Sequence, residues 1–199
     1  MQSLSDYEII GRVLDGHTRL FSELVERHQD KAMTLAVRML RSREDAEEAI
    51  QDAFVRAFKA LPRFEWKSSF STWLYRIVYN VCSTRLSRRD EEFRTRLDLD
   101  DEAAVMLVSD ELPPDIRYET EEIENIIRAE IDQLPPVYSA ICTLFFVQDM
   151  SYDQIVEVTG IPLGTVKVRL FRSRLMLRDA VVRKIGPRPI VSEKIRQEE

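Results

Sequence analysis

Glycine, cysteine and histidine are scarce in this chain, and each shortage excludes a class of protein. Only 5 of its 199 residues are glycine, which argues for helices rather than for the tight turns of a β-sheet fold. The 2 cysteines, Cys82 and Cys142, lie in apolar helical patterns without a CxxC spacing, so we expect buried free thiols in a reducing compartment. The histidines, His17 and His28, do not have the spacing of metal ligands. The sequence therefore predicts neither a disulfide framework nor a metal site.

Long apolar runs are also missing. No stretch approaches the roughly 20 apolar residues that cross a membrane, and the N-terminus does not have the pattern of a signal peptide. The sequence shows no nucleophile and base pair, phosphate-binding glycine loop or metal cluster, which argues against an enzyme. We expect a cytoplasmic protein without membrane insertion, catalytic residues, cofactor or small-molecule substrate.

Charge is distributed unevenly along the chain. The net charge is -6, yet residues 63–89 carry six bases and one acid, and residues 161–189 carry eight bases and one acid. Residues 90–132, between these segments, carry 16 acids and 4 bases. Two basic modules thus flank an acidic connector, and each module can bind phosphate locally although the whole chain is acidic.

Most of the chain has the apolar periodicity of amphipathic helices. Helices are predicted over residues 6–14 and 18–40, and a third begins after the cap Ser42 and stops before Pro62. The outer face of this third helix is largely acidic; charge alone favours a solvated face, and a docking surface for a basic partner is the alternative. Further helices are predicted from Phe70 onward and in the C-terminal half. The fold class that follows is all-α, with two small helical domains joined by a flexible acidic linker.

The most informative stretch is 151–178, which has the pattern of a helix-turn-helix. Ser151 and Gln154 have the spacing of a capping box, so one helix begins there. Gly160 ends that helix, because glycine tolerates a left-handed backbone, and Pro162 suits the first turn of the next one. The second domain is accordingly predicted to be a four-helix domain that contains this motif.

The second helix of the motif has two distinct faces at about 100° per residue. One face is apolar and is assigned to the core: Val166, Leu170, Ser173 and Leu177. The other mixes bases with apolar side chains: Lys167, Val168, Phe171, Arg172 and Leu175. The mixed face suits the major groove of DNA. A solvated hairpin and a protein interface remain the alternatives.

Aromatic residues crowd the loop at 63–69 and the helix that follows it. The aromatic residues are Phe64, Trp66, Phe70, Trp73, Tyr75 and Tyr79, and Arg63, Lys67 and Arg76 lie among them. Rings next to cations can hold unstacked bases while the cations contact the backbone. Plain core packing explains the same residues equally well, and both interpretations stay open.

Three segments, at 45–64, 68–80 and 134–174, resemble the two conserved blocks of extracytoplasmic-function (ECF) sigma factors of the sigma-E type. They read DAEEAIQDAFVRAFKALPRF, SSFSTWLYRIVYN and LPPVYSAICTLFFVQDMSYDQIVEVTGIPLGTVKVRLFRSR. The resemblance implies a bacterial initiation factor that binds core RNA polymerase and two elements of promoter DNA and promotes melting. It implies sigma region 2 at 1–89, an acidic linker at 90–114, sigma region 4 at 115–184 and a tail without family match, expected to be disordered, at 185–199.

The resemblance also implies site residues, position by position. Those matching the helix that docks on the polymerase are Asp45, Glu48, Gln51, Asp52 and Phe54. Those at the minus-ten capture site are Ala60, Phe64, Lys67, Ser68, Ser69, Phe70, Trp73, Arg76 and Asn80. Those at the minus-thirty-five site are Thr165, Lys167, Val168, Phe171 and Arg172.

Three residues depart from the family pattern. Val168 stands where many relatives have a small polar or basic residue, and Glu65 and Trp66 replace a commoner pair of a base and a glycine. The base preference at both sites is therefore open. The family also implies an anti-sigma factor, often membrane-anchored, for which the apolar stripe of Val168, Phe171 and Leu175 is the expected docking site. The alternative function is a dimeric helix-turn-helix regulator of the LuxR-like type.

Overall fold

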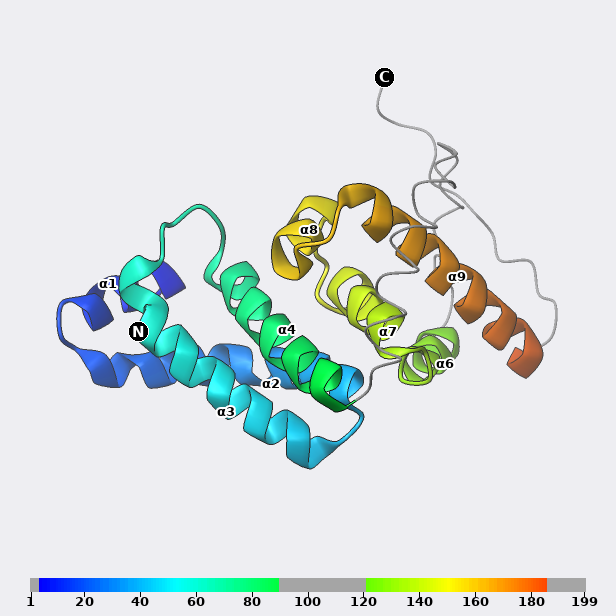
Figure 1. Ribbon diagram of the computed structural model, residues 1–199, viewed down its shortest axis with the longest axis horizontal. Coiled ribbons are helices and arrows are strands. Elements are labelled where there is room, and N and C mark those ends of the chain that lie inside the picture. Colours follow the sequence, from blue (N-terminus) through cyan, green and yellow to red (C-terminus); the bar gives the residue numbers. More distant parts are fainter. Residues whose placement is uncertain (1–3, 90–120, 186–199) are drawn as a thin grey trace, which may run out of the picture.

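The computed structural model describes residues 4–89 and 121–185, and every regular element within these ranges is helical (Figure 1). The N-terminal half contains α1 (Asp6–Leu14), η1 (Thr18–Leu20), α2 (Phe21–Leu40), α3 (Arg43–Ala60), η2 (Leu61–Arg63) and α4 (Phe70–Arg89). The C-terminal half contains α6 (Glu121–Ile131), α7 (Pro136–Cys142), the π-helical segment η3 (Thr143–Val147), α8 (Tyr152–Thr159) and α9 (Leu163–Ile185). The all-α prediction is confirmed.

Local sequence signals set the helix boundaries. Ser151 and Gln154 form the predicted capping box at α8, and Ser42 accepts a hydrogen bond from the backbone N–H of Asp45 at the start of α3. Gly160 ends α8 at φ 73°, in the left-handed region. Two expectations were slightly wrong: α9 begins one residue after Pro162, and it runs to Ile185 rather than to Arg178.

The core of the N-terminal half lies between α2, α3 and α4. Four alanines of α3, Ala46, Ala49, Ala53 and Ala57, are completely buried and let neighbouring helices approach closely. Both cysteines are buried free thiols, as predicted. No helix in the described part of the chain is both long and apolar enough to cross a membrane.

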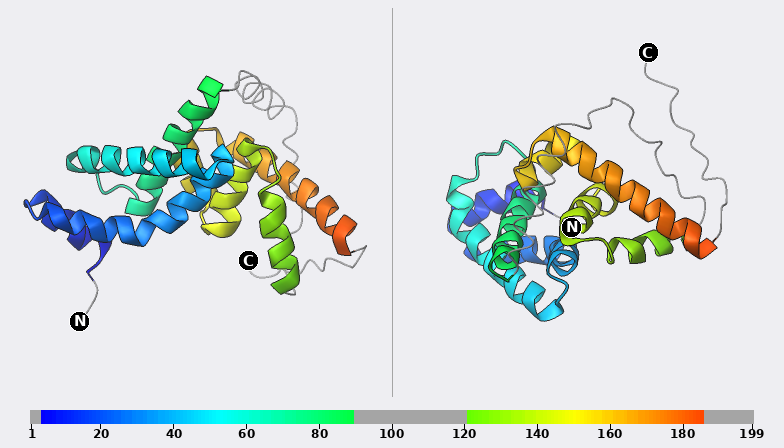
Figure 2. Two further views of the ribbon diagram at one scale, coloured as in Figure 1. Left: turned by 90° about the horizontal axis from the view of Figure 1, so that it is seen from below. Right: turned by 45° about the vertical axis from the view of Figure 1, so that its right-hand side comes forward.

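The two halves pack against each other. Helix α4 lies against α8, and α2 lies against α7, so that one apolar cluster runs through both halves (Figure 2). Polar contacts reinforce this packing: Arg38 pairs with Asp132 at 2.7 Å and donates to Thr143 Oγ1 at 3.2 Å. Arg41 donates to the backbone carbonyls of residues 133 and 134. The two expected helical units exist, but the sequence did not indicate that they associate.

The acidic linker at 90–114 lies outside the described residues, as does the tail beyond Ile185.

Candidate nucleic-acid and polymerase interfaces

An aromatic cluster forms where the loop at 64–69 enters α4. The Phe64 ring centroid lies 5.2 Å from that of Trp73, 5.1 Å from that of Trp66 and 6.4 Å from that of Phe70. Phe64 and Phe70 are only 5% and 2% exposed, whereas Trp66 is 45% exposed. Core packing therefore accounts for Phe64 and Phe70, whereas Trp66 is left at the surface, and contact with unstacked bases stays a prediction.

The loop has a defined conformation. Trp66 has φ 59°, a left-handed backbone that suits glycine better than a residue with a Cβ. Glu65 and Lys67 form an ion pair on either side of it. The hydrogen bond and charge of Lys67 lower the pKa of Glu65, and the same contact raises the pKa of Lys67. Ser69 Oγ accepts the backbone N–H of Thr72 at 3.1 Å, so this hydroxyl helps to start α4.

The residues predicted for the minus-ten site differ in exposure. Lys67, Arg76 and Asn80 are exposed. Ala60, Ser68, Ser69 and Trp73 are partly buried. Phe64 and Phe70 form the floor below them, so in this conformation neither ring is open to a base. Arg76 and Asn80, four residues apart, share one face of α4, and Lys67 lies in the loop that precedes this helix.

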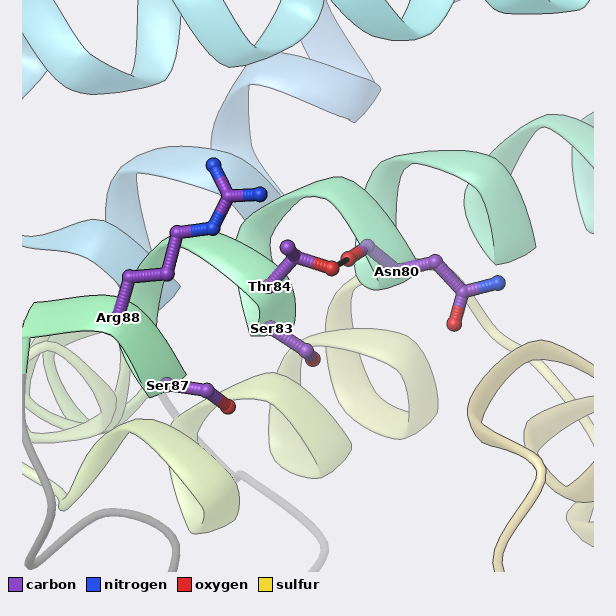
Figure 3. A pocket seen from close by; sticks show the side chains of 5 residues that line it. All are labelled: Asn80, Ser83, Thr84, Ser87 and Arg88. Atoms are coloured by element: carbon purple, nitrogen blue, oxygen red, sulfur yellow. Dashed lines mark hydrogen bonds between the residues drawn. The ribbon is translucent and has the colours of Figure 1, made fainter.

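A groove continues along α4 beyond Asn80. It has a volume of about 510 Å³ and is lined by Asn80, Ser83, Thr84, Ser87 and Arg88. Figure 3 shows these five side chains along α4, with Thr84 Oγ1 donating to the backbone carbonyl of Asn80 at 2.8 Å. The last four of these residues were not among the predicted site residues. Their signal was the spacing of polar residues at three and four positions after Asn80.

The acidic face of α3 is exposed but partly neutralised by arginines. Asp52 accepts two hydrogen bonds from Arg56, at 3.0 and 2.8 Å. Glu48 pairs with Arg85 of α4 at 3.1 Å, and its side chain is 72% exposed. Gln51 is exposed and Asp45 partly so, while Phe54 is 7% exposed and lies in the core. Of the residues predicted to dock on polymerase, only Phe54 is inaccessible.

Helix α9 presents a smaller outer face than the helical period predicted. Lys167 and Phe171 are exposed and Arg172 is partly exposed. Thr165 and Val168 are only 4% and 8% exposed, so placing Val168 on the outer face was wrong. The reason is that α6, α7 and α8 all pack around α9, which buries a wider arc than one stripe. The proposed apolar stripe shrinks to Phe171 and the half-buried Leu175.

Two arginines of α9 are structural. Arg169 is completely buried, and Arg174 is 6% exposed, with its guanidinium over the rings of Phe145 and Phe146 at 5.3 and 5.7 Å. Lys184 pairs with Glu130 of α6 at 2.7 Å. The positive charge available to a ligand is therefore less than the sequence count suggests.

Comparison with known proteins gives a consistent result for both halves. The family Sigma-70 region 2 matches residues 24–92, and the family Sigma-70, region 4 matches residues 124–177. The ECF RNA polymerase sigma factor SigW of Bacillus subtilis is 33% identical over 85% of this chain and 92% of its own length. The ECF RNA polymerase sigma-E factor of Haemophilus influenzae is 30% identical over 90% of this chain and 97% of its own length.

Two solved structures share the fold. One is CnrH in complex with the cytosolic domain of CnrY, with a TM-score of 0.60, 23% identity, and coverage of 90% of this chain and 98% of that one. The other is the sigma factor RpoE in complex with the anti-sigma factor NepR from Bartonella quintana, with a TM-score of 0.59, 17% identity, and coverage of 81% and 96%.

Proposed function

This chain belongs to the extracytoplasmic-function sigma factors, and from that premise we propose which of its surfaces bind the polymerase and which bind promoter DNA. As a sigma factor it directs core RNA polymerase to promoters. Neither matched family and none of the relatives named above belongs to the LuxR-like regulators. The roles below follow from exposure and charge.

The polymerase surface is the outer face of α3. Glu48 and Gln51 are exposed there, flanked by the partly exposed Asp45 and Asp52. Buried Phe54 and the alanines of the opposite face hold this surface in place. Since the arginine partners of Asp52 and Glu48 are themselves at the surface, a partner can replace these ion pairs at small cost.

The minus-ten surface is the exposed line of Lys67, Arg76 and Asn80 above the aromatic floor. A protein without a motor melts DNA only by holding the unpaired state more tightly than the duplex, which must offset a few kcal/mol of unstacking. Cations hold the strand, and Asn80 supplies both a donor and an acceptor for a base edge. The single observation that carries this assignment is the exposure of Asn80 beside the partly exposed Trp73 and the exposed Arg76 on α4.

The minus-thirty-five surface is the start of α9. Lys167 and Arg172 provide bonds to phosphate or guanine, and Phe171, 38% exposed, offers an apolar contact to a thymine methyl. Thr165 and Val168 are buried, so their proposed role is indirect: they pack α9 against its neighbouring helices and so fix its orientation.

The two halves must separate for both elements to be read together. The two promoter elements are centred about 25 base pairs apart, or roughly 85 Å of duplex at ~3.4 Å per base pair. A compact chain of 199 residues has a radius of gyration of only about 16 Å. The connector at 90–114 can span roughly 80 Å when extended, at ~3.3 Å per residue. We therefore assign regions 1–89 and 115–184 to two bodies that part on the promoter.

The family and the solved complexes support a proposal for the partners of this chain and for where it acts. Both solved neighbours are complexes, and in one of them the partner is the anti-sigma factor NepR; we propose an anti-sigma factor for this chain as well. We propose a non-catalytic factor that works in the cytoplasm, where polymerase and promoters are.

Co-purification with core polymerase and run-off transcription test the proposal. We expect a stable complex with core, and transcripts from promoters selected out of a randomised library. A dimer that binds duplex DNA without polymerase would instead support the LuxR-like alternative.

A further inference from the structure

The ring of Tyr7 on α1 stacks on the ring of Trp66 in the capture loop. Their centroids are 5.4 Å apart, and the ring planes differ by 28°. Both side chains stay about half exposed, Tyr7 at 48% and Trp66 at 45%. Tyr7 is outside the site that the resemblance implies, whereas Trp66 lies in the loop of that site, where its residue type departs from the family pattern.

These two rings end a row of aromatic side chains. The row starts at Trp73 on α4, passes through Phe64 to Trp66, with centroid separations of 5.2 and 5.1 Å, and reaches the surface at Tyr7. Trp73 and Asn80 are separated by two helical turns, about 10 Å along α4 at ~1.5 Å per residue. The row therefore links Trp73, two turns before Asn80, to the surface at Tyr7 through the buried ring of Phe64.

The position of Tyr7 is fixed by its neighbour in sequence. Asp6 Oδ2 lies 2.6 Å from His28 Nε2, and Asp6 Oδ1 accepts from Arg27 at 3.0 Å, which ties α1 to α2. The ring of His28 in turn meets that of Phe70, with centroids 5.2 Å apart. The ring of Tyr7 thus rests on two helices that are tied together, and the ring of Trp66, in the loop, packs against it.

Trp66 is held at the surface against the usual preferences of its residue type. A left-handed backbone is costly for a residue with a Cβ, and a half-exposed tryptophan gives up much of its burial energy. Lys67, the next residue in the chain, is an exposed cation that pairs with Glu65, and a phosphate can replace this surface ion pair at small cost. Aromatic rings with an adjacent cation are what single-stranded nucleic acid binds, because every base has a stacking face.

We propose that Tyr7 and Trp66 form a stacking platform for a second unpaired base of the promoter strand, separate from the base held near Asn80. The proposal rests on the minus-ten assignment above. It makes α1 part of the DNA interface. It also gives a function to Trp66, which stands where the family pattern has glycine.

The test is binding of holoenzyme to a single-stranded oligonucleotide that carries the selected minus-ten sequence, with one abasic site moved along it. Trp66→Gly removes the ring, and glycine adopts the backbone at φ 59° without strain. A loss of affinity in this variant therefore reports lost stacking and not a strained loop. We expect Trp66→Gly and Tyr7→Ala to weaken binding about 5- to 100-fold. Trp66→Phe and Tyr7→Phe should keep most of the affinity, and Leu14→Ala, an exposed apolar change on the same helix as Tyr7, should have no effect.

The abasic scan then decides the role. At one position an abasic site should make Trp66→Gly and wild type equal, and this position should differ from the one coupled to Asn80→Ala. If Trp66→Gly loses affinity equally for every abasic strand, the pair merely braces the loop and the platform is rejected. If some abasic position makes Asn80→Ala equal to wild type but none does so for Trp66→Gly, the platform alone is rejected. If some abasic position does so for Trp66→Gly but none for Asn80→Ala, the assignment of Asn80 alone is rejected.

Discussion

The hydroxyl of Tyr75 on α4 donates a hydrogen bond to Oε1 of Gln148, at 3.1 Å, across the junction of the two halves. The amide nitrogen of the same Gln148 donates to the backbone carbonyl of Lys31 on α2, at 3.2 Å. One side chain of the C-terminal half therefore bridges two helices of the N-terminal half. Because this bridge must break before the two DNA surfaces can part, its strength bears on activity.

Gln148→Ala should favour separation of the halves. A hydrogen bond contributes about 0.5–1.5 kcal/mol net, so losing two should raise the separated fraction roughly five- to a hundredfold. Fluorescence transfer between labels on α3 and α9 measures this, with Asn125→Ala, an exposed amide on α6 in the same half, as control. An unchanged transfer efficiency would show that apolar packing alone holds the halves together.

Stability should fall in alkaline solution because of the two buried thiols. Burial raises the pKa of Cys82 to about 12 and that of Cys142 to about 11, from 9.0. A raised pKa in the folded state means that the unfolded chain loses these protons first. The stabilisation is complete below pH 9 and is lost as the pH rises, by at most about 1.4 kcal/mol per thiol per pH unit.

Urea titrations between pH 8 and 11 measure this loss. The double variant Cys82→Ala, Cys142→Ala, compared with wild type at each pH, should show a shallower decline. Equal slopes for both proteins would mean that other groups cause the alkaline loss.

Asp52→Arg should impair binding to core polymerase. It reverses a charge on the outer face of α3 and places two arginines four residues apart, which costs the helix only about 0.5 kcal/mol. A competition assay for core measures the affinity, with circular dichroism to confirm folding. Glu26→Arg makes the same charge change on the exposed surface of α2 and should leave the affinity unchanged. Equal affinity of Asp52→Arg and wild type for core would exclude this face.

The sequence predicts features that depend on neighbours in the chain and misses those that depend on packing. Ser151, Gly160 and Ser42 act within one turn, so their caps were predictable. Val168 is buried because three helices meet around α9, and no helical period encodes that. Likewise, the contact of Tyr7 with Trp66 joins segments far apart in the sequence, and an amphipathic pattern does not say which helix covers which face.

Arg172→Ala should weaken promoter binding by about 1–3 kcal/mol if its guanidinium reads a base edge. The loss should be largest on the preferred sequence and should relax selectivity at one position of the upstream element. Arg183→Ala, an exposed change near the end of the same helix, should have little effect on selectivity. Binding of randomised upstream elements by holoenzyme compares the two variants. A loss that is uniform over all sequences would make Arg172 a phosphate contact instead.

Asn80→Ala should slow promoter opening far more than it weakens closed binding. Closed binding depends on phosphate contacts and on α9, which the substitution leaves intact, whereas opening depends on the extra affinity for an unstacked base. Since Asn80 is exposed, its removal leaves the core unchanged, unlike Phe64→Ala, which would open a cavity beneath Trp66 and Trp73. Asn80→Ala is therefore the cleaner probe of the two.

Permanganate footprints on matched and pre-opened templates distinguish these steps. A template already mismatched through the minus-ten element needs no melting energy, so it should restore part of the activity of Asn80→Ala. Restoration stays partial, because the site still holds its base less tightly. Thr34→Val serves as control, because it removes a hydroxyl that donates to a backbone carbonyl four residues earlier, in α2 rather than in the groove beside Asn80. If Asn80→Ala opens duplex promoters at the wild-type rate, the capture role assigned to Asn80 is wrong.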